Sequence, residues 1–181
     1  MKVFVNFGHD RTYDSGAINP LSKLRECDVA YNIGQLVVKY LNDVGIETKF
    51  LQSDNLYHDS EYDLPCVVDE ANEWNADVFI AIHCNSFNTK ASGTEVEVYK
   101  YGGDSDKLAT YIQGQIVNSL KTIDRGVKER PNLVVLNATN MPAVLVETAF
   151  IDNESDVKLL VNNQDDFARA IARGVTDYAV W

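Results

Sequence analysis

Short apolar runs alternate along the chain with longer segments whose apolar residues recur at helical spacing. The runs are rich in β-branched and aromatic residues and predict strands at residues 2–7, 47–51, 77–83, 94–101 and 143–150. The intervening segments predict helices at residues 22–44, 64–76, 104–123 and 163–180. Strands that alternate with helices are typical of an α/β fold.

The apolar pattern within the runs predicts the kind of sheet. Residues 77–83 and 143–150 are almost continuously apolar, which indicates strands buried on both faces, as in a parallel sheet. The run "TEVEVYKY" at 94–101 alternates instead, which predicts an edge strand with one face toward water. We therefore expect a three-layer α/β domain: a mostly parallel, twisted sheet with helices on both faces. No linker interrupts the pattern, so we expect residues 1–181 to form a single domain.

The longest predicted helix carries a carboxylate on its apolar side. Ser22 is a candidate N-cap, Gly45 stands where a C-terminal glycine belongs, and Glu26 precedes an apolar stripe of Ala30, Ile33, Val37, Leu41 and Val44. Glu26 lies four, seven and eleven residues before members of that stripe, so its side chain shares their face. A buried, unpaired carboxylate costs several kcal/mol, so Glu26 needs a partner.

Composition narrows the class of protein. Hydrophobic residues make up 45% and charged residues 24% of the 181 residues, as in globular proteins. A formal net charge of −11, with no basic stripe, argues against nucleic acid as a partner. No apolar run approaches the roughly 18 residues of a transmembrane segment. The chain opens on a strand pattern rather than a signal peptide, so we expect a cytoplasmic protein.

Three of the predicted strands end in a residue that can bind a metal or carry a proton: His9, His83 and Glu147. The carboxyl ends of parallel strands meet at one edge of a sheet, so these side chains could converge there with Glu26. His9, Glu26 and His83 would supply three zinc ligands and leave a fourth position for water. Glu147 would then take a proton from the zinc-bound water and return it to the leaving amine.

Each of these residues also has an ordinary structural explanation. A single histidine at a strand end is more often part of the core or rim than a ligand, and Glu26 could pair with Lys23 or Arg25. Only the combination favours a metal site. His58 lies in the polar loop "NLYHDSEYD" and is interpreted as solvent-exposed surface.

Other residues near the proposed ligands have lesser roles. Cys84 and Cys27 adjoin His83 and Glu26, but neighbouring residues on a strand or helix point in different directions, so we expect neither thiol in the site. The ordinary structural explanation of the cysteines is that they are small buried residues. Asp10 and Asp14 could orient the imidazole of His9.

Several motifs resemble a known family. They are "FGH", "DSGA", "LRECDVAYNI", "ADVFIAIHCNS", "RGVKERPNLVVLNATNMPAVLVETAFIDN" and "FARAIARGV". In this order, over nearly the whole chain, they resemble the zinc-dependent N-acetylmuramoyl-L-alanine amidases of the amidase-3 type. The resemblance implies a peptidoglycan hydrolase that cleaves the amide between N-acetylmuramic acid and the L-alanine of the stem peptide. His9, Glu26 and His83 fall on the family's zinc ligands, and Glu147 falls on its catalytic glutamate.

The remaining expectations concern the substrate. Asn85 and Asn137 are candidates for substrate contact, although both could make only local hydrogen bonds. The stretch "GHDRTYDSGA" lacks the pair of glycines usual in the family, so the resemblance does not define the shape of this part of the substrate groove. The stretch "PCVVDEAN" lacks the arginine that family members often carry before "AN". The same ligands would also suit a zinc-dependent peptidase or deacylase that acts on another amide. A further alternative is a wall-binding module without catalysis, but such a module would not need Glu147 on a buried strand beside a metal.

The segment 86–125 bears on regulation. Many relatives insert a regulatory helix before the "RGVK" motif, whereas here one strand and one helix fill the segment. We therefore expect no activator protein. The chain looks most like the catalytic domain of a phage or prophage endolysin, cytoplasmic until it is released to the cell wall; the alternative is a bacterial autolysin or sporulation amidase.

Overall fold

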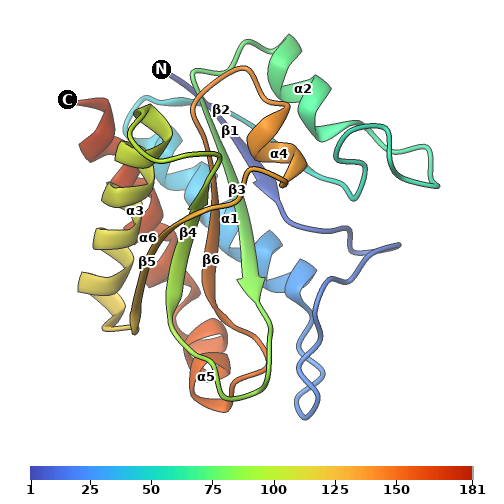
Figure 1. Cartoon of the computed structure of the whole chain (residues 1–181), viewed down its shortest axis with the longest axis vertical. Coiled ribbons are helices and arrows are strands. Elements are labelled where there is room, and N and C mark those ends of the chain that lie inside the picture. Colours follow the sequence, from blue (N-terminus) through green and yellow to red (C-terminus); the bar gives the residue numbers. More distant parts are fainter. Residues whose placement is uncertain (181) are drawn as a thin grey trace.

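Six strands form one sheet in residues 1–180, the part of the chain that the computed structural model describes. The strand order is β2-β1-β3-β6-β4-β5 (Figure 1). Every neighbouring pair is parallel except β4 and β6, which are antiparallel. The strands are β1 (Lys2–Phe7), β2 (Glu47–Gln52), β3 (Val78–Asn85), β4 (Thr94–Val98), β5 (Asp124–Glu129) and β6 (Ala143–Phe150).

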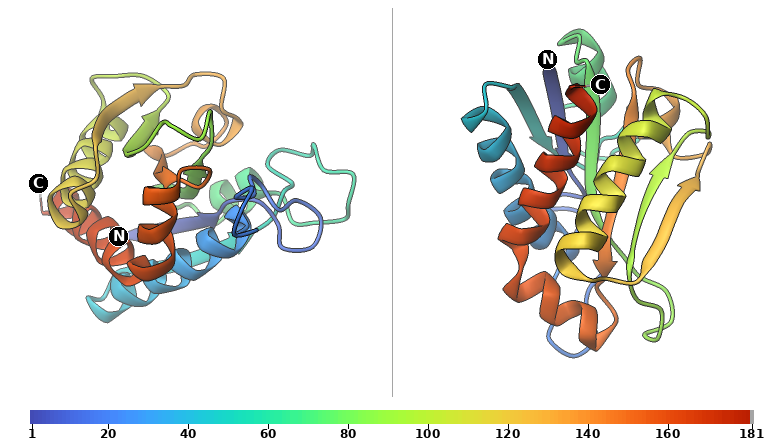
Figure 2. Two further views of the ribbon diagram at one scale, coloured as in Figure 1. Left: turned by 90° about the horizontal axis from the view of Figure 1, so that it is seen from below. Right: turned by 90° about the vertical axis from the view of Figure 1, so that its left-hand side faces the viewer.

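Helices cover both faces of the sheet. One face carries α1, α3 and α6, and the other carries the short α2 and α4 (Figure 2). The helices are α1 (Glu26–Asp43), α2 (Val67–Glu73), α3 (Asp104–Leu120), α4 (Val134–Asn137), α5 (Glu154–Asn162) and α6 (Gln164–Ala179). The expected three-layer α/β fold with a mostly parallel sheet is therefore confirmed.

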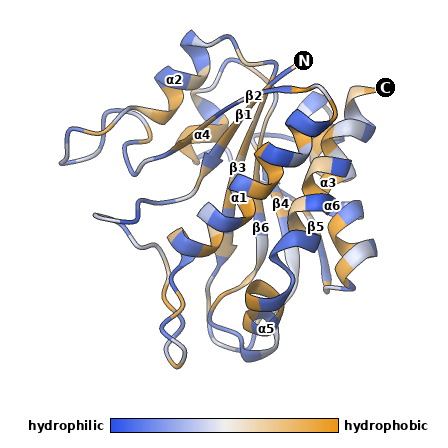
Figure 3. Ribbon diagram, turned by 180° about the vertical axis from the view of Figure 1, so that it is seen from behind, coloured by the Kyte–Doolittle hydropathy of each residue, from blue (hydrophilic) through white to orange (hydrophobic). Residues whose placement is uncertain are grey.

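Alternate residues of the central strands feed the two hydrophobic cores. On β3, Ile80, Ile82 and Cys84 face α1, α3 and α6, whereas Phe79 and Ala81 face α2 and α4. The apolar stripes of the helices turn inward and their charged faces turn outward, as the colouring of Figure 3 shows. Burial on both sides explains why this strand is almost continuously apolar. Among residues 1–180, every helix falls short of the length and apolar character that a membrane span requires.

The prediction of an edge strand at 94–101 is wrong. β4 lies between β6 and β5, and all five of its residues are buried. Its alternating pattern arises because Val96 and Val98 enter the main core while Glu95 and Glu97 pair with arginines on the other face. The strand at this edge of the sheet, β5, is charged and only half buried, and apolar periodicity did not reveal it.

Helix boundaries also differ from the sequence expectations. α1 begins at Glu26 rather than after Ser22, because Asn19 accepts hydrogen bonds from the backbone N–H groups of Leu21 and Ser22 and holds them in a turn. α2 is shorter than residues 64–76, since the first N–H groups of the helix donate to carbonyls of the preceding loop. The short α4 and α5 lack a long apolar stripe and were not predicted.

Candidate active site

The parallel strands β1, β3 and β6 are neighbours, so their carboxyl ends lie at one edge of the sheet. Two loops, residues 8–25 and 53–66, flank this edge and project to the right in Figure 1. The loops touch each other through Tyr13 and Tyr62, whose rings stack with centroids 3.7 Å apart. The site is thus built from a rigid sheet edge and two connected loops.

His9 follows β1 in a tight turn. Its backbone is left-handed, with φ of 65°, which turns the imidazole back over the strand ends. Gly8 allows a close approach beside it: a Cβ atom there would lie 2.5 Å from Cε1 of His83. The rings of His9 and His83 consequently meet edge to face, with centroids 4.9 Å apart.

Glu26 lies between the two histidines. Its Oε1 atom is 3.1 Å from Nε2 of His9 and 3.0 Å from Nδ1 of His83. Backbone N–H groups fix the carboxylate, because Cys84 donates to Oε1 at 3.0 Å and Ala17 donates to Oε2 at 2.9 Å. Glu26 is only 4% exposed, so the expectation that its carboxylate is buried and has partners is correct.

The charges and hydrogen bonds around His9, Glu26 and His83 favour a positive charge between these three side chains. Burial alone would lower the pKa of His9, but hydrogen bonds and charge from Glu26 and Asp14 outweigh it and raise that pKa to about 9. Burial would likewise raise the pKa of Glu26, yet the two histidines hold it well below its usual range. An ionised carboxylate and two imidazoles together form a set of ligands that attracts a cation.

Asp14, rather than Asp10, orients His9. The Oδ2 atom of Asp14 is 2.6 Å from Nδ1 of His9, and its Oδ1 atom accepts from Gly16 N–H at 3.0 Å. Asp10 instead accepts from the backbone of Thr12 and Tyr13 and shapes the loop. With Nδ1 bonded to a carboxylate, Nε2 of His9 is the nitrogen that can bind a metal.

The thiols lie away from the histidines, as expected. Cys84 points into the main core, where its Sγ atom is 3.4 Å from Oγ1 of Thr148. Burial raises the pKa of Cys84 well above its ordinary value, with the charge of Glu26 adding to the effect. Cys27 is also buried, and burial raises its pKa. Both thiols are therefore neutral side chains of the protein interior.

Glu147 lies beside His83 on the neighbouring strand, since the two residues are register partners. As a residue it is partly buried, but its Oε2 atom is inaccessible to solvent and has no hydrogen-bond partner. Burial raises the pKa of Glu147 well above the usual value, and the charges of Glu26, Glu97 and Glu95 raise it further. This carboxyl group is therefore suited to hold a proton.

An arginine–glutamate cluster next to Glu147 was missed by the sequence analysis. Arg125 Nε lies 2.7 Å from Glu95 Oε2, and Arg130 Nε lies 3.1 Å from Glu97 Oε1. Together with Glu147 the four residues line a hollow of about 390 Å³. The available signal was the pair of glutamates at alternate positions of "TEVEV", which need buried partners once the strand is known to be internal.

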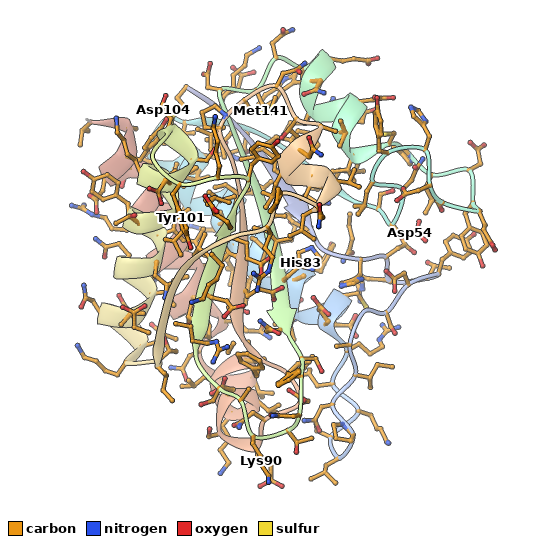
Figure 4. All side chains as sticks on the ribbon, in the orientation of Figure 1. Asp54, His83, Lys90, Tyr101, Asp104 and Met141 are labelled. Atoms are coloured by element: carbon orange, nitrogen blue, oxygen red, sulfur yellow. The ribbon has the colours of Figure 1, made fainter. Side chains whose placement is uncertain are left out.

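The structure separates the two asparagines proposed to contact substrate. Asn85 lines the same hollow as Glu147 and donates from Nδ2 to Glu95 Oε1 at 3.0 Å. Asn137 is exposed at the end of α4 and lines a different hollow with Tyr99 and Met141. Asn137 therefore does not join the group around His83, which Figure 4 labels.

The residues brought together suit a divalent metal ion. One ligand atom from each of His9, Glu26 and His83 lies within 4.8 Å of the others. Two imidazole nitrogens and one carboxylate oxygen are donors that zinc accepts, and three protein ligands leave room for a further ligand. The donor set thus fits zinc, with Glu147 next to it as a carboxyl group whose Oε2 atom has no hydrogen-bond partner among residues 1–180.

Comparisons with known proteins identify the family of the chain. A profile of the N-acetylmuramoyl-L-alanine amidase family matches residues 3–177. The uncharacterized protein YqiI of Bacillus subtilis is 36% identical over 180 residues, which cover 97% of this chain and 84% of YqiI. The N-acetylmuramoyl-L-alanine amidase LytC of the same organism is 35% identical over 181 residues, which cover 97% of this chain but only 35% of LytC.

A solved structure shows the same fold. The CwlD amidase of Clostridioides difficile, solved in complex with the GerS lipoprotein, superposes with a TM-score of 0.87 at 27% identity, covering 99% of this chain and 98% of CwlD. The match of sequence and fold leads to one conclusion. The chain belongs to the N-acetylmuramoyl-L-alanine amidase family.

Proposed function

We propose that the chain hydrolyses the amide between N-acetylmuramic acid and the L-alanine of the peptidoglycan stem peptide, with Zn²⁺ held by His9, Glu26 and His83. One observation carries the proposal: a His–Glu–His donor set, with Glu26 buried and both histidines partly buried, lies at a sheet edge beside a carboxyl group whose Oε2 atom has no hydrogen-bond partner among residues 1–180. Family membership supports the choice of bond.

Each ligand has a distinct reason to be in place. Asp14 bonds Nδ1 of His9 and leaves Nε2 for the metal, while the N–H groups of Ala17 and Cys84 fix Glu26. The chemistry that zinc supplies in such a donor set is Lewis acidity toward a water molecule and the carbonyl of an amide. The protein supplies the orientation, because all three side chains are held by backbone or carboxylate contacts.

Glu147 is proposed to carry the proton. It would accept a proton from the attacking water and deliver it to the nitrogen of the leaving L-alanine, so that water adds across the C–N bond with no net change in protons. Burial raises the pKa of Glu147, and this favours the protonated carboxyl group that delivers its proton to the leaving amine. Within the described residues 1–180, no hydrogen-bond donor of the protein competes for this Oε2 atom.

The hollow beside Glu147 is the proposed binding place for the substrate around the scissile amide. Asn85 donates from Nδ2 to Glu95 Oε1, and its Oδ1 atom would accept a hydrogen bond from a stem-peptide N–H. Phe87 is 78% exposed and lines the same hollow. The proposed role of Asn137 in substrate contact stays a prediction for a separate hollow.

We also propose that the enzyme works without an activator protein. In residues 86–125 the chain forms β4, α3, their loops and the first two residues of β5, and the hollow by Glu147 is open. The complex of CwlD with GerS shows that a protein of this fold can have a partner, which makes the experiment necessary. The endolysin origin and the cytoplasmic location before release both stay predictions.

One digestion experiment tests these points. The purified chain, given zinc but no other protein, is expected to clear isolated cell walls and release new amino groups of L-alanine without new reducing sugar ends. Another newly exposed amino acid would indicate the alternative, a zinc-dependent peptidase, and reducing ends would indicate a glycosidase. Clearing only after a second protein is added would contradict activator independence while leaving the reaction itself in place.

A further inference from the structure

A second cluster of metal-ligating side chains lies outside the candidate active site. His58 belongs to the loop 53–66, Cys66 immediately precedes α2, and Asp69 lies within α2. One ligand atom from each lies within 4.8 Å of the others. Figure 4 labels Asp54 at the start of this loop and His83 in the active site.

We propose that His58, Cys66 and Asp69 form a second site for a divalent cation of the zinc type. An imidazole, a thiolate and a carboxylate are ligands that zinc accepts, and three protein ligands leave a fourth position for water. Thiolate ligation distinguishes this site from the His–Glu–His site, which offers no sulfur.

The geometry already brings the ligand atoms together. His58 Nε2 is 2.8 Å from Asp69 Oδ2, and the left-handed backbone of His58, with φ of 60°, turns its ring toward α2. Cys66 is only 7% exposed, and its thiol donates to the carbonyl of Leu56 at 3.4 Å. A cation here would have the protein interior on its sulfur side and solvent on its imidazole side.

The loop is held in this form by its own hydrogen bonds. Asp59 accepts from the N–H groups of Leu56 and Tyr57, and the carbonyls of Asn55 and Leu56 accept from Val67 and Val68. The backbone that carries His58 is therefore tied to the start of α2, where the other two ligands lie. Little ordering of the chain would oppose metal binding.

Binding would exchange protons for metal in a balanced way. The Cys66 thiol would release its proton to solvent as the sulfur–metal bond forms, and its hydrogen bond to Leu56 would be lost. The proton that His58 Nε2 shares with Asp69 would move to Nδ1 of the ring, or to solvent if the ring carries two protons, so that the Nε2 lone pair can bind the metal. The Asp69 carboxylate would then turn from His58 to the metal. No oxidant or reductant is required.

A bound metal would stabilise the loop 53–66, which lies beside the edge of the sheet that carries the active site. Tyr62 lies in the same loop and stacks on Tyr13, which belongs to the loop that carries Asp14. A metal that ties the 53–66 loop to α2 would therefore also steady the partner loop. The site is structural in this proposal and takes no part in amide hydrolysis.

Cobalt(II) is the probe, because its thiolate complexes show a sulfur-to-metal charge-transfer absorption that imidazole and carboxylate ligands do not give. Titration of the reduced, metal-free chain with Co²⁺ is expected to show this absorption in the wild type and in His83→Ala, but not in Cys66→Ser. Asp69→Asn should weaken the binding that produces it by at least ~10-fold. Asp63→Asn, which neutralises an exposed carboxylate of the same loop, should leave it unchanged.

A further variant guards against misfolding. His58 is exposed, so His58→Ala should preserve the fold, as far-ultraviolet circular dichroism will show, and should still lower the cobalt affinity. The absence of charge transfer in the wild type, or its persistence in Cys66→Ser, would overturn the proposal. Neither outcome bears on the amidase proposal, whose site contains no sulfur.

Discussion

At the scale of single residues, a few contacts decide how each titratable side chain can act. Asp14 selects the nitrogen of His9 that can bind a metal, and Glu26 is held by two backbone donors. Glu147 differs because its Oε2 atom has none of these contacts. In the proposed mechanism these three carboxylates therefore have different roles: Asp14 orients His9, Glu26 binds the metal and Glu147 carries the proton.

Replacing Glu147 with glutamine tests that division. Glu147→Gln keeps the shape of the side chain but removes its ability to accept a proton, so we expect turnover to fall by roughly 10²–10⁴-fold while the zinc content is unchanged. Wall clearing and metal analysis measure the two effects, and Glu61→Gln in an exposed loop is the control. Loss of zinc would make Glu147 a ligand instead.

The raised pKa of His9 predicts how the stability of the metal-free chain depends on pH. Folding raises this pKa from 6.5 to about 9, so the folded state binds the proton more tightly than the unfolded state. The resulting stabilisation is fully present below pH 6.5 and is lost as pH rises through about 9. Denaturant unfolding of the chelator-treated chain should therefore show a free energy of unfolding that falls across this interval.

A matched variant isolates this contribution. His9→Gln should flatten the decrease, because glutamine does not titrate, whereas His58→Ala should retain it, since His58 lies outside the site. An unchanged slope in His9→Gln would assign the pH dependence to another group.

At the scale of secondary-structure elements, the central β4 depends on charge pairs that apolar patterns cannot reveal. Glu95 and Glu97 are 3% and 6% exposed, and both pair with arginines that β5 or the residue after it supplies. Alternation of valine and glutamate indicates a wet face in most strands. Here the polar face is covered by arginine, so the same pattern occurs in an interior strand.

Removal of one arginine should show this dependence. Arg125→Met leaves Glu95 buried without its 2.7 Å partner, so we expect a loss of about 1–3 kcal/mol in the free energy of unfolding. Arg169→Met breaks an exposed ion pair with Asp165 and should cost less than ~1 kcal/mol. Denaturant titration compares the two variants, and equal losses would contradict the argument.

Much of the architecture could nevertheless be predicted from the sequence. Long apolar strands and long helices have periods that identify them, and five strands and the longest helices occur close to the predicted ranges. β5, α4 and α5 could not be found this way, because they bury too little apolar surface to leave a period. Helix starts were misplaced where side chains or carbonyls of preceding loops compete for N–H groups.

At the scale of the whole molecule, strand order determines which distant residues meet. The prediction that His9 and His83 would converge required only that their strands be parallel and near each other, and β1 and β3 are neighbours. The arginine cluster required knowledge of the antiparallel pair β4 and β6, which no local pattern encodes. The hollow beside Glu147 is a product of the assembled sheet.

The close approach at Gly8 limits how this chain can change over time. Position 8 lies just past the end of β1, where a sheet would ordinarily accept alanine or serine, but a Cβ atom would strike the ring of His83. A substitution there would push the imidazole of a neighbouring strand away from Glu26 while leaving the cores intact. Drift at this position is restrained by a histidine about 75 residues away in sequence, so selection on chemistry, rather than on folding, would keep the glycine.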